Sequence, residues 1–299
     1  MDLKTTVPVA LGQRLAVLSM DVEDWYHLDY LTGLSLPTSP SLLDGLDVYS
    51  ELLEEFSVPS TFFVVAEIAG QVAGRLRALQ ATGHDISCHG LTHRRPLTLA
   101  PDTFARQVRE AHTQLQDLIG GPVPGFRAPC FSLDRTRLEA VRATGFSYDC
   151  SKIACGHHPL YGNLDVSNFT RISPSIYVDG DFAEFEVSTL PLAGRRLPVS
   201  GGGYLRMFPW PVMRSLLTRY LRDADLYTLY IHPFELSSAP SPLARFPVPW
   251  KQALRFQLGR SSVPRKLRAL IMLLRDRGFK FTTFAALQKT CVRKDAVSV

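Results

Sequence analysis

Three short polar clusters contain the residue types that bind metals and transfer protons. The first is Asp21-Val22-Glu23-Asp24, the second runs from His89 to His93, and the third is His232-Pro233-Phe234-Glu235. Each cluster directly follows an apolar run of the length of a buried strand. Because the carboxyl ends of parallel strands form the active-site face of α/β barrels, we expect the three clusters to meet there.

The two histidines of the second cluster, His89 and His93, are four residues apart. If this segment turns helically, both imidazoles lie on one face and can bind one cation. Two imidazoles and a carboxylate suit Zn²⁺ or a related divalent metal and leave a position open for water. Such a metal lowers the pKa of that water and polarises a carbonyl group. A histidine pair at this spacing is more common on a surface helix, so the metal prediction depends on its position after a strand.

The acidic cluster can supply two carboxylates with different roles. Asp21 and Glu23 share a face if the strand continues, because side chains along a strand alternate with a period of two. One carboxylate can then bind the metal while the other accepts a proton from water. For any single aspartate at this place, a turn or a helix cap would be the alternative.

Further residues fit the same chemistry, each with a structural alternative. Arg127 could pair with a catalytic carboxylate and keep it ionised, or be an ordinary surface arginine at a strand end. His232 could donate a proton to a leaving group, or be a buried, hydrogen-bonded histidine. Asp149 could orient or tune His232, although a turn is the alternative for this acid. Trp25 and Tyr26 could form an apolar wall against a sugar ring, or pack in the core.

Strand-like and helix-like segments alternate between these clusters. Strands are predicted at 15–20, 60–65 and 84–88 and a strand end at 126–127, with helices at 41–56, 72–81, 101–119 and 135–144. This alternation predicts parallel strands joined by crossover helices, and the length of 299 residues favours a closed barrel. The Pro-, Gly-, Ser- and Asn-rich stretch 154–204 predicts long loops, with short strands such as 182–187, around the substrate mouth.

The composition is that of an ordinary globular protein, with 45% hydrophobic and 20% charged residues. No apolar run approaches the roughly 18 residues that span a bilayer. The apolar N-terminal stretch is broken by Pro8 and by Gly12-Gln13-Arg14, so we predict a cytoplasmic protein without a signal peptide. The five cysteines are odd in number and include no CxxC pair, which indicates neither a disulfide framework nor a zinc knuckle.

Positive charge is concentrated near the C-terminus, although the net charge is only +5. From Lys251 onward there are many Lys and Arg but only two acids, Asp276 and Asp295. This basic helical part could attract a phospholipid surface or a lipid-linked glycan, or it could be a solvated face. We predict no nucleic-acid partner and make no prediction of oligomeric state.

In this order, the motifs resemble the polysaccharide deacetylase (NodB-homology) family over nearly the whole chain. The motifs that match are 21–25, 89–93, 127–129 and 229–233. The closer likeness is to the subfamily in bacterial exopolysaccharide loci that accompany exosortase systems. Proteins of that subfamily also have a glycine cluster like 200–204, a His-Pro-aromatic-Glu motif like 232–235, a Tyr-Asp segment and a basic helical tail.

The resemblance implies one distorted (β/α) TIM-like barrel domain over 1–299, with a metal held by an acid and two histidines. At the matching positions, Asp21 is the catalytic base, His232 the catalytic acid and Arg127 the arginine that positions the base. His89 and His93 match the histidine ligands.

The first motif departs from the family pattern. Many members have two adjacent aspartates where this chain has Asp-Val-Glu-Asp. The carboxylate ligand is therefore either Glu23, which strand geometry favours, or Asp24, which matches the usual residue type.

The function predicted from the resemblance is metal-dependent removal of acetyl groups from a carbohydrate, with Zn²⁺ as the expected metal. The expected substrate is an acetylated saccharide such as an exopolysaccharide or its lipid-linked precursor, with the oxyanion bound by the metal and a backbone N–H near Cys130. One alternative is a metal-independent hydrolase of a cyclic amide, since some relatives with altered first motifs are of that kind. Others are an inactive glycan-binding barrel and a membrane-surface adaptor that uses the basic tail.

Overall fold

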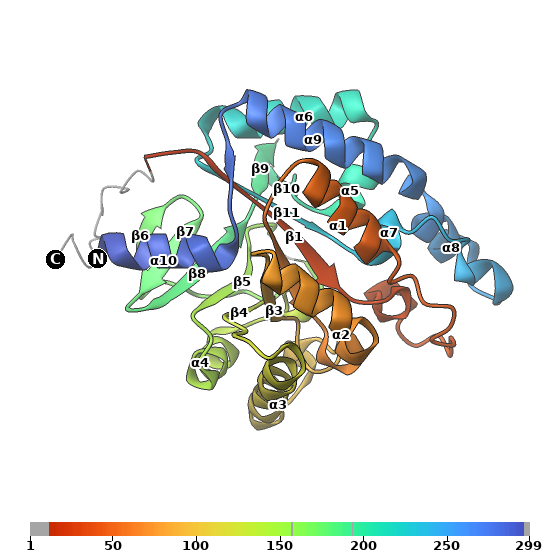
Figure 1. Cartoon of the computed structure of the whole chain (residues 1–299), viewed down its shortest axis with the longest axis horizontal. Helices are drawn as coiled ribbons and strands as arrows, with labels where there is room; N and C mark the ends of the chain where they lie inside the picture. Colours follow the sequence, from red (N-terminus) through yellow and green to blue (C-terminus); the bar gives the residue numbers. More distant parts are fainter. Residues whose placement is uncertain (1–11, 157, 193, 296–299) are drawn as a thin grey trace.

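The computed structural model describes residues 12–156, 158–192 and 194–295, and its centre is a curved, mostly parallel sheet (Figure 1). Seven strands lie side by side in the order β11-β1-β2-β3-β4-β5-β8, and all of these neighbours are parallel. Their bounds are β1 Leu15–Val22, β2 Ser60–Val64, β3 Asp85–Cys88, β4 Gly125–Phe126, β5 Tyr148–Ile153, β8 Phe182–Val187 and β11 Leu226–Ile231.

Shorter strands extend this sheet at its margins. Beyond β8 the sheet continues antiparallel, and a separate hairpin and a short strand beside β1 complete the β structure. These strands are β6 Thr170–Ser173, β7 Ile176–Asp179, β9 Thr189–Leu192, β10 Arg195–Pro198 and β12 Lys280–Phe281.

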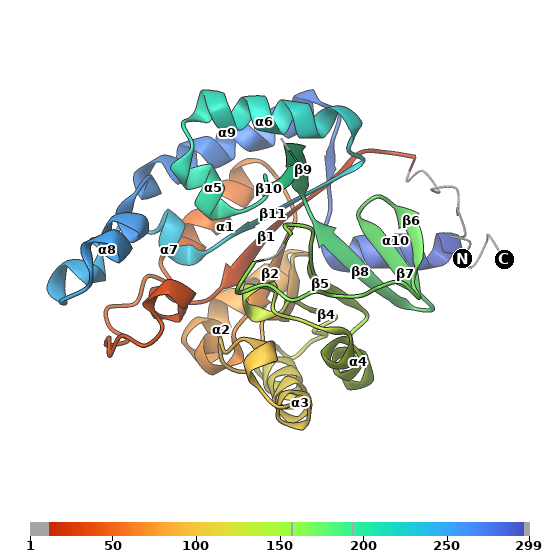
Figure 2. The same cartoon turned by 180° about the vertical axis from the view of Figure 1, so that it is seen from behind.

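Helices cover the outer face of the curved sheet and both of its ends (Figures 1 and 2). The long helices are α1 Gly45–Glu55, α2 Ala66–Ala81, α3 Pro101–Ile119, α4 Arg135–Thr144, α6 Trp210–Asp223, α9 Val263–Asp276 and α10 Phe284–Asp295. The short ones are α5 Gly202–Met207, α7 Pro233–Leu236 and α8 Trp250–Gln257. None of the described helices is long and apolar enough to cross a membrane.

The strand–helix pattern follows from where apolar side chains fall along the chain. All eight residues of β1 are buried, as expected for a strand covered on both faces. In α3, the buried residues recur every three or four positions, which places them on one face against the sheet. The helix begins at Pro101 and ends before Gly120, which adopts a left-handed conformation with φ 67°.

Side chains take the place of a backbone ladder where β8 approaches β11. The N–H of Ser188 donates to Oγ1 of Thr228 at 3.0 Å, and the N–H of Thr228 donates to Oγ of Ser188 at 2.9 Å. Close by, the N–H of Tyr230 donates to the carbonyl of Ser200 at 2.8 Å. The sheet is thus curled into the predicted distorted (β/α) barrel, but the barrel is not closed by backbone pairing, because β8 and β11 share no ladder.

Two helix starts differ from the predicted ones. The first helix begins at Gly45 instead of 41, and the second begins at Ala66 instead of 72. The early start of α2 has a tertiary cause: the N–H groups of Ala66 and Glu67 donate to the carbonyls of Gly90 and Leu91. The loop after β3 therefore satisfies N–H groups that a free helix end would leave without partners.

Candidate active site

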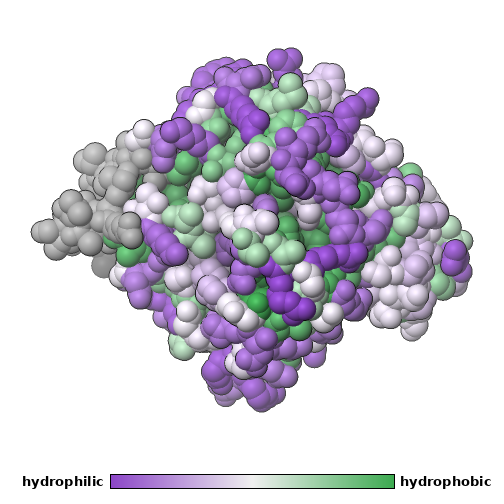
Figure 3. All heavy atoms as spheres, viewed as in Figure 1, coloured by the Kyte–Doolittle hydropathy of each residue, from purple (hydrophilic) through white to green (hydrophobic). Residues whose placement is uncertain are grey.

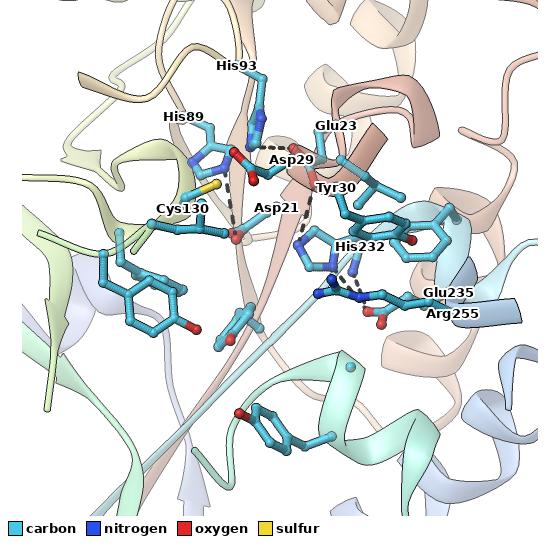
Figure 4. A pocket seen from close by; sticks show the side chains of 18 of the residues that line it. Asp21, Glu23, Asp29, Tyr30, His89, His93, Cys130, His232, Glu235 and Arg255 are labelled. Carbon is cyan, nitrogen blue, oxygen red and sulfur yellow. Dashed lines mark hydrogen bonds and ion pairs between the residues drawn. The ribbon is translucent and has the colours of Figure 1, made fainter. Parts of the chain in front are cut away.

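A pocket at the carboxyl ends of β1, β3 and β11 brings the three polar clusters together (Figure 4). Asp21, Glu23, His89, His93 and His232 all line it. They come from segments far apart in sequence, and parallel strand ends are what place them at one edge of the barrel.

Glu23, His89 and His93 form one compact group of metal-ligand atoms. One carboxylate oxygen and one nitrogen from each ring all lie within 4.8 Å of one another. The shortest approach, 2.5 Å, joins Nε2 of His93 to Oε2 of Glu23. Figure 4 shows the three side chains pointing toward a common region.

The segment that carries the two histidines is a loop, so the helical turn considered as a way to bring the two rings together is not formed. Its chain direction changes at Gly90, where φ is 92°, a conformation that L side chains rarely adopt. The imidazoles of His89 and His93 are nevertheless close, with ring centroids 5.2 Å apart.

Hydrogen bonding fixes the orientation of the His89 ring. Its Nδ1 lies 2.8 Å from the carbonyl oxygen of Arg127, to which it donates when the proton is on that nitrogen. Burial lowers the pKa of His89 to about 4, which favours the neutral ring. The lone pair of Nε2 then faces the carboxylates, with Oδ2 of Asp21 4.0 Å away. This is the arrangement that metal-binding histidines adopt.

Glu23 is a buried carboxylate that suits a cation. Burial alone raises its pKa, but His93, His232 and His89 lower the pKa of Glu23 to about 2. Its Oε2 is buried and makes no hydrogen bond among the described residues. The 2.5 Å approach of Nε2 of His93 does not have the direction of a hydrogen bond. A buried anionic oxygen without such a bond, beside two imidazole nitrogens, fits a divalent metal such as Zn²⁺.

Asp24, the other predicted carboxylate ligand, lies outside this group. Its Oδ1 accepts hydrogen bonds from the N–H groups of Trp25 at 2.8 Å and Leu42 at 2.9 Å. Its carboxylate therefore caps the short turn after β1 and ties the chain to the start of α1. Between the two alternatives, the geometry favours Glu23.

Arg127 holds Asp21 through a buried ion pair. Nη1 of Arg127 lies 2.6 Å from Oδ1 of Asp21 and also donates to Oγ of Ser19 at 2.9 Å. The guanidinium lies over the ring of Phe63, 4.0 Å from its centroid. Burial on its own lowers the pKa of Arg127, but the charge of Asp21 raises it above its ordinary value. Arg127 thus compensates the negative charge of Asp21 and fixes one of its oxygens.

Removal of this guanidinium should destabilise the fold. We expect Arg127→Leu to lower the free energy of unfolding by about 3–5 kcal/mol, because Asp21 would remain buried without its partner. The matched control is Arg75→Leu, which breaks the exposed ion pair with Asp47 and should cost at most about 1 kcal/mol. Urea denaturation followed by circular dichroism measures both values; equal losses would contradict a special role for the Arg127–Asp21 pair.

His232 is oriented by Glu235, which the sequence prediction did not assign. Oε2 of Glu235 accepts from the N–H of His232 at 3.1 Å and lies 3.2 Å from its Nδ1. Burial by itself lowers the pKa of His232, but Glu235, with smaller contributions from Glu23 and Asp21, raises it to about 9. The imidazole is therefore protonated at neutral pH and can act as an acid.

Glu235 is itself held from the opposite side by the glycine cluster and the arginine that follows it. Nε of Arg206 lies 3.3 Å from Oε1 of Glu235. A Cβ at Gly202 would lie 1.9 Å from Oε2 of Glu235, so any larger residue would displace the carboxylate from this position. Glutamate three residues after a histidine that precedes a short helix is a capping-box pattern, and this was the available sequence signal.

The prediction that Asp149 orients His232 is not supported. Asp149 lies on β5, where it accepts from the N–H and the hydroxyl of Ser151, and it does not line the pocket. Burial raises the pKa of Asp149. Burial and the neighbouring charge of Asp149 both raise the pKa of Glu184. Ser151 in turn accepts from the N–H of Ala128 at 2.9 Å, so Asp149 supports the segment that carries Arg127.

The apolar wall of the pocket differs from the predicted one. Trp25 is fully buried and donates from Nε1 to the carbonyl of Pro40, and neither Trp25 nor Tyr26 lines the pocket. Core packing was the alternative, and it applies because the chain turns after Asp24. The aromatic side chains that line the pocket are Tyr30, Phe131, Tyr161, Tyr204, Tyr230 and Phe234.

The backbone at Cys130 is unusual. Cys130 and Phe131 have φ of 55° and 52°, which non-glycine residues seldom adopt, and both line the pocket. Such conformations persist only where the surrounding structure enforces them, and they cluster at functional sites.

Comparisons with known proteins agree with this arrangement. The polysaccharide deacetylase family model matches residues 46–148, and a domain of unknown function, DUF3473, matches residues 150–289. A peptidoglycan deacetylase of Helicobacter pylori is 21% identical over 117 residues, 39% of this chain, and the chain spans 40% of the length of that relative.

Two solved structures share the fold. A Mycobacterium smegmatis protein assigned as a polysaccharide deacetylase is similar with a TM-score of 0.63 and 17% identity, over 99% of this chain and 96% of that one. The PuuE allantoinase is similar with a TM-score of 0.57 and 15% identity, over 96% and 94% of the two chains. With the motifs of the first, second and third clusters assembled in one barrel, the chain has the fold and the motif order of the polysaccharide deacetylase (NodB-homology) family, whose model matches residues 46–148.

Proposed function

We propose that this chain is a metal-dependent hydrolase that removes acetyl groups, N-acetyl groups in particular, from a saccharide. The observation that carries this proposal is the donor set of Glu23, His89 and His93 in one pocket with Asp21 and His232. A base, an acid and a metal site at one strand edge are the parts that amide hydrolysis requires.

Glu23, His89 and His93 are the proposed ligands of a divalent metal, with Zn²⁺ as the expected ion. Bound there, the metal would polarise the acetyl carbonyl and lower the pKa of water. The chain supplies the remaining chemistry through Asp21, Arg127, His232 and Glu235.

Asp21 is the proposed general base. Arg127 occupies its Oδ1, so Oδ2 is the oxygen left to accept the proton of the attacking water. Water adds to the acetyl carbonyl carbon, and the N–H of Cys130 is the proposed backbone donor to the oxyanion. When the C–N bond breaks, the imidazolium of His232 protonates the departing amine nitrogen, and acetate is released.

The proposed substrate class is an exopolysaccharide or its lipid-linked precursor. The aromatic side chains of the pocket offer faces on which sugar rings can pack. The match to DUF3473 covers the half of the chain that contributes Tyr161, Tyr204 and Tyr230 to this wall. The Helicobacter pylori relative, by its name, acts on another acetylated glycan.

Acetate release from a panel of acetylated saccharides, with and without chelator, tests the proposal. We expect release from at least one N-acetylated saccharide, loss of activity with chelator, and recovery on addition of Zn²⁺. The fold shared with an allantoinase makes a cyclic amide a necessary member of the panel. Hydrolysis of the cyclic amide alone, unaffected by chelator, would replace this proposal, and saccharide binding without any release would indicate an inactive barrel.

The pH dependence of this activity should depend on Glu235. Because Glu235 stabilises the protonated form of His232, Glu235→Gln lowers the pKa of His232. The acid is then lost at lower pH, so the basic limb of kcat/KM against pH should move to lower pH than in the unaltered protein. The matched control is Glu186→Gln, which alters a carboxylate bound to Tyr177 outside the pocket. An equal loss at every pH in Glu235→Gln would instead indicate only a structural role.

A further inference from the structure

Helix α8 carries an exposed apolar stripe. Trp250 and Leu254 lie on α8 and Leu258 directly follows its last residue; the three are spaced by four residues and are 70%, 53% and 46% exposed. Residues four apart lie on one face of a helix. The opposite face of α8 is attached to the body through Phe256, its one fully buried side chain. The stripe is therefore the outward face of a helix that contributes little to the core.

The stripe lies at one end of the molecule, away from the barrel axis. Figures 1 and 2 both show α8 projecting at the end opposite β6, β7 and α10. In the space-filling view this end is mostly white and pale, whereas the rim formed by α3 is purple (Figure 3). A projecting ridge can enter a deformable surface, whereas docking into a partner protein would require a matching groove.

The charges around the stripe are positive. No Asp or Glu occurs between residues 236 and 275. Arg245, Lys251 and Arg265 are exposed, and no described residue makes an ion pair with them. Other basic residues of this region have internal roles: Lys266 is buried and donates to three carbonyls at the end of α5, and Arg260 donates to the carbonyls of Phe234 and Ser237.

We propose that α8 docks this protein on an anionic phospholipid membrane. Trp250, Leu254 and Leu258 enter the lipid interface, where indole rings are favoured. Lys251 and Arg245 contact the headgroup phosphates. An apolar stripe flanked by lysine and arginine, in a segment that contains no acids, is the composition of an interfacial helix.

This surface adjoins the mouth of the pocket. Arg255, from α8, and Met207, which is 53% exposed, both line the pocket. Arg255 lies over the ring of Tyr30, 4.2 Å from its centroid, which fixes α8 to the pocket rim. If the deacetylase function holds, docking through α8 brings the pocket to saccharides that are attached to lipid.

Vesicle co-sedimentation of the full chain tests the proposal. The probes are vesicles of phosphatidylcholine alone and of phosphatidylcholine with about one third phosphatidylglycerol. We expect binding to the anionic vesicles, weakened by salt, and weak binding to the neutral ones. The variant W250S/L254S/L258S should lose about tenfold in affinity for anionic vesicles. The variant R245E/K251E should also bind less and with a smaller dependence on salt.

The matched control is V212S/M272S, which removes exposed apolar side chains from α6 and α9. It should bind vesicles like the unaltered protein. Thermal unfolding and metal content show whether each variant is folded, since none of the substituted residues lines the pocket. Binding is measured without substrate, so it succeeds or fails independently of acetate release.

Three results would overturn the proposal. They are a failure of the unaltered protein to bind anionic vesicles, binding of W250S/L254S/L258S as tight as that of the unaltered protein, and a loss of affinity in V212S/M272S as large as that in W250S/L254S/L258S. Light scattering separates a further case. In that case the unaltered protein self-associates and does not bind vesicles, and the triple serine variant is monomeric. The stripe would then join two copies of the chain.

Discussion

The variants His89→Ala and His93→Ala are each expected to lose the bound metal and to reduce acetate release about a thousandfold or more. Each removes one of the two imidazoles that face Glu23, which leaves two protein ligands where a zinc site of this kind needs three.

Metal content after dialysis, measured by mass spectrometry, and single-substrate kinetics check this expectation. The matched control is His112→Ala, which removes a half-buried imidazole on α3 that contacts the carbonyl of Val123, outside the pocket. It should retain full metal content and activity. Activity in a metal-free His93→Ala protein would refute the proposed chemistry.

The second large effect is expected for Asp21→Asn. This change keeps the size of the side chain and removes the proton acceptor, so kcat should fall by about 10²–10⁴-fold. The metal should remain, since Glu23, His89 and His93 are unchanged. Loss of activity with the metal retained would distinguish Asp21, the proposed base, from the residues proposed to bind the metal.

The neighbouring carboxylate provides the comparison for that variant. Asp24→Asn keeps the oxygen that accepts from the N–H groups of Trp25 and Leu42, and it should retain both metal and most of the activity. Loss of metal in Asp24→Asn with metal retained in a Glu23→Gln protein would mean that the ligand had been assigned to the wrong acid.

The elements that position the site were predictable because their signals are local. The bounds of α3 and α4 agree with the predicted 101–119 and 135–144, since Pro101 begins one helix and Gly120 and Gly145 end them. Apolar runs marked the strands, and the polar residues directly after them marked the pocket edge. Starts fixed by tertiary contacts, such as that of α2 against the loop at Gly90, were missed.

Within the site, the uncertain assignments were those that depend on where the chain turns. Glu23 and Asp24 are adjacent, and only the turn after β1 directs one into the pocket and the other toward Leu42. The aromatic wall was missed because its tyrosines have no shared spacing: Tyr30 lies in a short 3₁₀ helix, Tyr161 in a loop and Tyr204 in α5. Glu235 could have been assigned from its capping position, whereas the effect of Gly202 on it required coordinates.

Anomalous diffraction from a crystal soaked in Zn²⁺, recorded at the zinc absorption edge, tests the central claim most directly. A peak bound by Nε2 of His89, Nε2 of His93 and a carboxylate oxygen of Glu23, with Asp21 and His232 on either side, is the expected result. No peak in the pocket at full soaking, or a zinc ion held elsewhere while these three side chains bind only each other, would contradict the account.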